Sequence, residues 1–140
     1  MKKLFSFLLI LISLNTFSQK DTLGLYLKCY KGGDTISIDS LKNIPNLSIL
    51  RGGKGQNDCN ILSWEIAVYN DGAISLFPGY AGPTIAGQIN GALRKAGNNP
   101  PEKIVFQGIV VSVKSGDTFV KQKLEPVTFY LTKKARKICK

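Results

Sequence analysis

The sequence predicts a mainly β protein, an immunoglobulin-like β-sandwich of about seven strands with one short helix. Three observations predict this class. Short segments carry apolar residues at every second position, turns rich in glycine separate them, and only one segment has helical spacing. Many short strands in one chain favour a sandwich over a parallel α/β sheet.

The first eighteen residues have the pattern of a cleavable signal peptide. A basic start at Lys2–Lys3 precedes an apolar stretch at Leu4–Leu14, and cleavage is expected between Ser18 and Gln19. The alternative is a retained membrane anchor, but about 11 apolar residues fall short of the roughly 20 that a spanning helix needs. The sequence therefore predicts an exported protein, periplasmic or secreted, with no transmembrane segment after cleavage.

The chain divides into a signal peptide at 1–18, one domain at 19–132 and a basic tail at 133–140. Loss of Lys2 and Lys3 reduces the 19 basic residues to 17, against 9 acidic residues, which gives a net charge of +8. This excess favours anionic partners, although a solvated basic surface is the plainer explanation. The tail is typical of a soluble terminus rather than a recognition element.

The N-terminal part of the domain predicts a hairpin. Leu25–Tyr30 alternates, Gly32–Asp34 is a turn signal, and Thr35–Ile38 resumes the alternation. Asp39 then caps a short helical turn, and Leu47–Leu50 forms another short strand.

The polar loop Arg51–Asn60 contains the letters GGKG. This segment lacks the spacing of a phosphate-binding loop and has no strand–helix frame around it, so a hairpin loop is expected.

The clearest strand starts an inward row at Leu62 and continues to Tyr69, with Trp64 in the middle of that row. We expect Trp64 to pack in the core between two sheets rather than contact a ligand. Asn70–Gly72 turns this strand into the next one at Ala73–Phe77.

The second half predicts one helix and two closing strands. Pro83–Ala96 has an apolar residue every four positions and is expected to form a helix packed on the sheet. The closing strands are Lys103–Val113 and Leu124–Thr132, with a turn at Ser115–Asp117 between them. The inward parity of the first closing strand switches at Gly108, which predicts a β-bulge or a bend.

The composition argues against catalysis. The chain contains no histidine, which removes Ser-His and Cys-His nucleophiles, histidine bases and most zinc sites. Its cysteines lack C-x-x-C spacing, and its nine acidic residues are scattered over turns and exposed strand positions, of which Glu65 lies within a strand. The sequence therefore predicts no enzyme, no catalytic residue, no metal site and no cofactor.

The three cysteines of an exported chain allow one intramolecular disulfide and leave one thiol over. Cys139 lies in the charged tail, so the favoured pair is Cys29–Cys59, although the sequence does not decide between the pairings. This pair closes a loop of about 30 residues and contributes on the order of 3–4 kcal/mol.

The order of elements resembles one family. The segments KGGDTISIDSLKNIPNLSIL (Lys31–Leu50), EKIVFQGIVV (Glu102–Val111) and KLEPVTFYL (Lys123–Leu131) are similar to the C-terminal domain of GldM, also called PorM. GldM is the periplasmic shaft protein of the Bacteroidetes gliding and type IX secretion machinery. The resemblance covers about Leu25–Thr132, and its motifs are structural rather than catalytic.

The resemblance implies an immunoglobulin-like sandwich that contacts other envelope proteins and has no catalytic residues. GldM proteins carry this domain behind an N-terminal helix that crosses the inner membrane, whereas this chain has a cleavable signal and one domain. The motor-shaft role therefore does not carry over. We expect an exported protein-interaction module, an accessory or paralogous component of that envelope machinery, of unknown oligomeric state.

The alternative function is a basic binding protein for acidic glycan, lipopolysaccharide or another anionic ligand, with nucleic acid the least favoured of these. The basic residues that would serve it, if one face gathers them, are Lys28, Lys31, Arg51, Lys54, Lys121 and Lys123. The tyrosines that could supply contact aromatics are Tyr26, Tyr30, Tyr69, Tyr80 and Tyr130.

Overall fold

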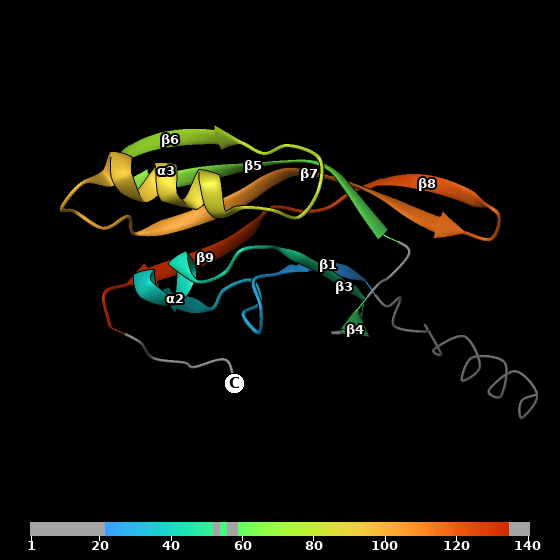
Figure 1. Ribbon diagram of the computed structural model, residues 1–140, viewed down its shortest axis with the longest axis horizontal. Helices are drawn as coiled ribbons and strands as arrows, with labels where there is room; N and C mark the ends of the chain where they lie inside the picture. The colour runs from blue at the N-terminus through green and yellow to red at the C-terminus, as the bar shows by residue number, and fades with distance from the viewer. Residues whose placement is uncertain (1–21, 52–53, 56–58, 135–140) are drawn as a thin grey trace, which may run out of the picture.

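The computed structural model of the chain describes residues 22–51, 54–55 and 59–134. The predicted signal peptide, most of the basic tail and part of the GGKG loop lie outside these residues. The described chain is mainly β, as the sequence predicts, and forms two sheets with two helices (Figure 1). In the described ranges, no helix is long and apolar enough to cross a membrane.

The small sheet has three antiparallel strands in the order β1-β3-β4. Its strands are β1 (Leu23–Tyr26), β3 (Ser48–Arg51) and β4 (Lys54–Gly55).

The large sheet has six strands. Five of them follow the order β2 (Thr35–Ser37), β9 (Val127–Thr132), β7 (Lys103–Ser115), β5 (Cys59–Asn70) and β6 (Ala73–Pro78). The sixth, β8 (Thr118–Lys123), pairs with the second half of β7. All neighbours are antiparallel except β2 and β9, which pair in parallel.

The predicted hairpin between the first two strands is wrong, because β1 belongs to the small sheet and β2 to the large one. β1 ends at Tyr26, and a tight turn follows in which Leu27 and Tyr30 exchange backbone hydrogen bonds of 3.0 and 2.9 Å. Lys28 occupies the left-handed region of this turn with φ 57°. The turn redirects the chain, so the alternation in Leu25–Tyr30 does not continue as a strand.

The two helices differ in how well the sequence predicts them. Helix α3 (Ala86–Ala96) agrees with the helix predicted over 83–96 and buries Ile89 and Ala92. Helix α2 (Ile38–Lys42) is capped by Ser37, whose hydroxyl accepts a bond from the Ser40 N–H at 3.1 Å. The predicted cap at Asp39 is therefore wrong, since the helix begins one residue before it.

Two bulges shift the register between β5 and β7. Ser63 pairs with Val110 and Glu65 with Gln107, so β7 has an extra residue at the predicted position, where Gly108 has φ 60°. A second bulge lies between Ile61 and Ser63 and places the extra residue on β5. Because of it, the inward position expected for Leu62 falls to Ile61, and Leu62 is 36 % exposed.

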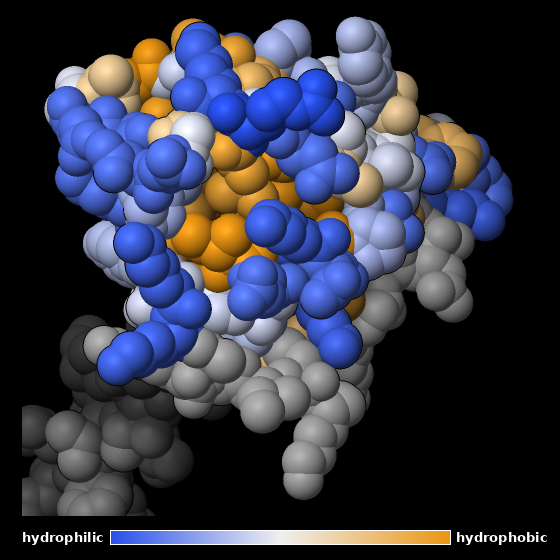
Figure 2. All heavy atoms as spheres, turned by 60° about the vertical axis from the view of Figure 1, so that its left-hand side comes forward, coloured by the Kyte–Doolittle hydropathy of each residue, from blue (hydrophilic) through white to orange (hydrophobic). Residues whose placement is uncertain are grey.

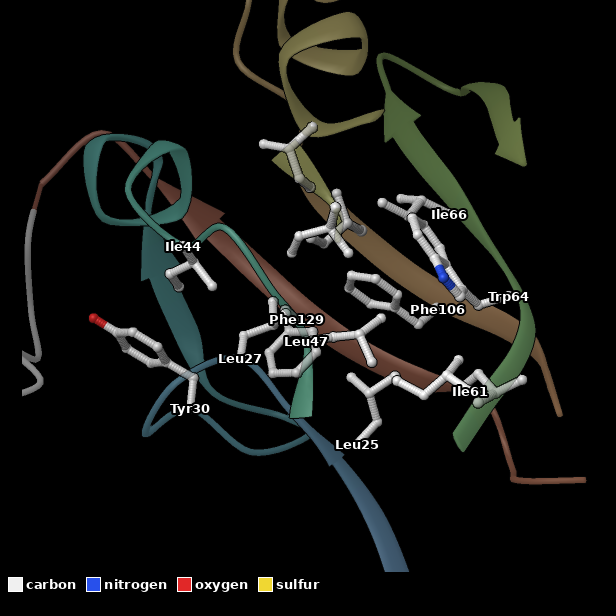
Figure 3. Close-up of a cluster of buried hydrophobic side chains, with 14 of the residues drawn as sticks. Leu25, Leu27, Tyr30, Ile44, Leu47, Ile61, Trp64, Ile66, Phe106 and Phe129 are labelled. Carbon is white, nitrogen blue, oxygen red and sulfur yellow. The ribbon is translucent and has the colours of Figure 1, made fainter. Parts of the chain in front are cut away.

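One hydrophobic core joins the two sheets and the helices (Figure 3). Figure 3 shows side chains of the N-terminal segment, including Leu27, gathered against Phe106 and Phe129 of the large sheet. The Phe106 ring centroid lies 6.0 Å from those of Trp64 and Phe129. Trp64 is 3 % exposed and its indole N–H donates to the Gly82 carbonyl at 3.0 Å, which confirms its predicted place in the core.

Strands β4 and β8 were not predicted. The expected turn at Ser115–Asp117 links β7 to β8 and not directly to β9. The β7–β8 hairpin projects from one end of the molecule (Figure 1). We call this hairpin, from Lys114 to Lys123, the arm.

Candidate functional site

The large sheet has one face free of the described core. Since Trp64, Ile66, Phe106 and Phe129 point into the core, the residues between them point the other way. This outer face consists of Glu65, Ala67, Tyr69, Ile74, Leu76, Pro78, Lys103, Val105, Gln107, Thr128 and Tyr130. The small sheet and both helices contribute their buried residues to the opposite side.

The strand registers arrange the outer face in three rows across the sheet. The first row is Tyr130–Lys103–Tyr69–Ile74, the middle row is Thr128–Val105–Ala67–Leu76, and the last row is Gln107–Glu65–Pro78. The middle row has no charged residue, whereas the first row carries the positive charge of Lys103 and the last row the negative charge of Glu65. The centre of the face is therefore uncharged, and its two ends along the strands carry opposite charges.

Local contacts hold the two charges in place. The Lys103 ammonium lies 4.5 Å from the centroid of the Tyr69 ring, which is a cation–π distance. The Gln107 side-chain amide donates to the Glu65 carboxylate at 2.7 Å. A hollow of about 440 Å³ lies beside this pair, and Glu125 also lines it.

The outer face exposes apolar side chains that the core does not use. Ile74 is 57 % exposed, Leu76 56 % and Tyr130 49 %. Ala67, in the middle row, is only 1 % exposed because its neighbours cover it. Apolar residues clustered on one face, rather than scattered, mark an interaction surface.

The arm is the second exposed surface. Every residue of β8 is exposed, including Phe119 at 59 % and Val120 at 53 %. Alternation along the paired strands puts Phe119 on one side with Lys114, Lys121 and Lys123, and Val120 on the other. One side of the arm is therefore basic with an aromatic residue in its middle.

The six basic residues that the sequence singled out do not share one face. Lys28 and Lys31 lie in the segment between β1 and β2, and Arg51 pairs across from Lys54 at the end of the small sheet. Lys121 and Lys123 are together on β8. Lys121 and Lys123 lie with Lys114 around the exposed Phe119 ring.

The tyrosines also separate into groups. Tyr30 is 2 % exposed and belongs to the core, so it is not a contact aromatic. Tyr26 and Tyr69 are half-buried, whereas Tyr80 and Tyr130 are exposed by 79 % and 49 %. Sequence reasoning missed Phe119, although the run Thr118–Val120 has the aromatic and β-branched composition of a strand.

The predicted Cys29–Cys59 disulfide is wrong. Cys29 is disulfide-bonded, but Cys59 is a free thiol. Cys59 lines a cavity of about 710 Å³ together with Leu47–Leu50, Ile61 and the turn Ala81–Pro83. Burial raises the pKa of the Cys59 thiol, and the nearby Arg51 opposes this shift.

A smaller hollow lies at the opposite end from the arm, between the helices. It measures about 190 Å³ and has Ile38, Leu93 and Pro101 as apolar lining with Lys42 and Lys133 beside them. Figure 2 views this end and shows apolar atoms framed by hydrophilic side chains.

Within the described ranges, no group of three or more His, Cys, Asp or Glu residues could hold a metal ion. Every buried side-chain nitrogen and oxygen described there has a hydrogen-bond partner, so none points unpaired toward a ligand. No family model, no curated protein and no solved structure matches the chain.

Proposed function

We propose that this chain is a non-enzymatic, exported protein-interaction module and that the arm is its partner-binding element. The observation that carries this proposal is that β8 buries none of its six side chains. A strand with every residue exposed adds little to the core, yet it leaves more than half of the Phe119 and Val120 side chains in water, at a cost in solubility. A binding partner that covers these side chains would explain why the strand exposes them.

The side chains of the arm indicate the chemistry of the partner. Phe119 is a large, rigid anchor of the kind that dominates binding energy when a partner pocket encloses it. Lys114, Lys121 and Lys123 surround it on the same side, and opposite charges on a partner would speed encounter and fix orientation. The partner surface is therefore acidic around an apolar pocket.

The immunoglobulin-like topology also belongs to the proposal. In such domains the C, F and G strands are neighbours and variable-type domains add C′ beside C. The order β9-β7-β5-β6 follows this G-F-C-C′ arrangement, and Trp64 lies on β5, the counterpart of the C strand that carries a buried tryptophan. The chain departs from the pattern between β6 and β7, where α3 stands in place of strands.

The proposed setting is the bacterial envelope, as an accessory or paralogous component of the gliding and type IX secretion machinery. The similarity of the three quoted segments to the GldM C-terminal domain and the signal-like N-terminus support this setting.

The test is photo-crosslinking in the native cells. The full chain carries benzoyl-phenylalanine in place of Phe119, and a matched control carries it in place of Asn90, an exposed residue of α3. Covalent capture of one envelope protein by the Phe119 probe and not by the Asn90 probe is expected. Equal labelling from both positions, or none from Phe119, would exclude the arm as the partner-binding element.

A second candidate function rests on the same basic side of the arm, which could bind an anionic glycan or lipopolysaccharide. Electrostatic binding of this kind weakens steeply with salt. A Lys121→Gln/Lys123→Gln variant should then lose heparin and lipopolysaccharide binding, while a Lys42→Gln/Arg94→Gln variant with the same net charge should keep it. Binding that is equal in both variants would reflect net charge and would exclude a glycan site on the arm.

A further inference from the structure

We infer that the outer face of the large sheet binds a second copy of this chain, face to face, in a two-fold symmetric dimer. This inference rests on the outer face, and the arm borders the proposed contact at Lys123. It rests on how the two charges of the outer face are placed relative to its apolar middle row.

The face is complementary to itself. Lys103 lies in the first row, paired with Tyr69, and Glu65 lies in the last row, four residues before Tyr69 on β5. A two-fold axis across the strands, through the middle row, turns the first row of one copy onto the last row of the other. Lys103 then lies over Gln107 and beside Glu65 of the second copy, and symmetry repeats this contact at the other end.

The same operation matches the apolar side chains. Leu76 and Val105 of the middle row meet their own counterparts, while Ala67 between them is already covered by its neighbours. An axis along the strands would instead bring the two Lys103 side chains together, which like-charge repulsion disfavours. The charge pattern therefore selects one of the two in-plane axes.

The hollow beside Glu65 could accept the Lys103 side chain of the second copy. It measures about 440 Å³ and opens next to the Glu65–Gln107 pair, with a second carboxylate from Glu125 in its lining. An ammonium group inserted there would meet two acidic side chains and one lysine, Lys123, from the same lining. The net charge of the hollow favours a cation.

The outer face is small for a protein–protein interface. Three strand spacings from β6 to β9 at about 4.8 Å and four residue steps at about 3.3 Å span roughly 14 Å by 13 Å between Cα atoms. Even with side chains added, this is less than the roughly 800 Å² per partner of a standard interface. A face of this size is expected to give a weak, concentration-dependent dimer.

Sedimentation equilibrium of the full mature chain tests the inference. A monomer–dimer equilibrium that weakens with salt is expected, and Glu65→Lys or Lys103→Glu alone should raise Kd at least about tenfold. The double variant Glu65→Lys/Lys103→Glu restores the pairing with the signs exchanged and should return Kd to within about threefold of the parent.

Two further variants control the test. Lys114→Glu, on the arm, changes the charge as much as Lys103→Glu and should leave the dimer intact. Leu76→Arg changes a side chain that is already 56 % exposed, so it should preserve folding and abolish the dimer. A chain that stays monomeric up to millimolar concentration, a dimer that Leu76→Arg does not affect, or single charge variants that the double variant does not rescue would overturn the inference.

Discussion

Gly79 is the residue at which the fold leaves least room for a side chain. A Cβ atom added there would lie 2.1 Å from two carbons of the buried Trp64 ring. The Gly79 N–H also donates to the Trp64 carbonyl at 2.8 Å, so the backbone cannot move away without losing a hydrogen bond. The glycine is required because the chain must pass directly over the indole.

Gly79→Ala is therefore expected to destabilise the protein by about 1–3 kcal/mol, the usual cost of forcing extra atoms into a packed core. Gly87→Ala is the matched control, because nothing lies within 4 Å of its added Cβ and it is in helix α3. The control should be neutral or more stable by up to about 1 kcal/mol. Denaturant unfolding measures both, and equal effects would contradict this account.

The Cys59 thiol gives a prediction at the same scale. Since burial raises its pKa, folded Cys59 holds its proton more tightly than an exposed cysteine. We expect slower alkylation of the folded protein than of the unfolded chain at the same mildly alkaline pH. Mass spectrometry after timed iodoacetamide treatment measures this rate, and equal rates in folded and unfolded protein would contradict it.

At the scale of the elements, backbone pairing decides which residue caps helix α2. The sequence offers Asp39, Ser37 and Ser40 as hydroxyl or carboxylate caps within four residues. The parallel pairing of β2 with β9 keeps the chain extended through Ser37, so the helix starts directly after it and Ser37 becomes the cap. Residue type alone could not locate this boundary.

Ser37→Ala should therefore cost about 1 kcal/mol, the typical value for loss of an N-cap. Asp39→Ala, the matched control, removes only a favourable charge in the first helical turn and should cost less than about 0.5 kcal/mol. Thermal or denaturant unfolding compares the two. A larger effect of the Asp39 variant would restore the prediction made from sequence.

The side chains of the arm are expected to contribute little to the free energy of unfolding. Phe119→Ser/Val120→Ser alters two exposed side chains and should change the free energy of unfolding by less than about 0.5 kcal/mol each. Val111→Ala, in the buried strand beside it, should cost about 1–3 kcal/mol. Denaturant unfolding would show a large loss in the double variant if the arm stabilised the fold.

The elements that the sequence predicted are those whose signals are local. The hairpin at Asn70–Gly72, the helix over 86–96, the bulge at Gly108 and the buried Trp64 follow from turn residues, helical spacing and parity. The pairing partners could not be predicted, because β2 bonds to β9 across about ninety residues and no local pattern encodes that contact. The charge rows of the outer face depend on the registers of β5 with β7 and of β7 with β9, which no local pattern encodes either.

On the scale of the whole molecule, a disulfide adds a constraint beyond the sheets. Cys29 is disulfide-bonded, Cys59 is free, and the sequence contains one further cysteine, Cys139, outside the described residues. We expect a non-reducing digest to contain a disulfide-linked peptide pair that includes Cys29 and not Cys59, and reduction to lower the free energy of unfolding by about 2–5 kcal/mol. A peptide pair containing Cys59 would contradict this assignment.

The parallel contact between β2 and β9 has a consequence for the order of folding. Strand β9 lies inside the large sheet, between β2 and β7, and among the described strands it is the last to leave the ribosome. Until it arrives, β2 has no partner in the sheet and Phe129 is missing from the core. The large sheet therefore cannot be completed until β9 has been made, so this long-range pairing forms late in folding.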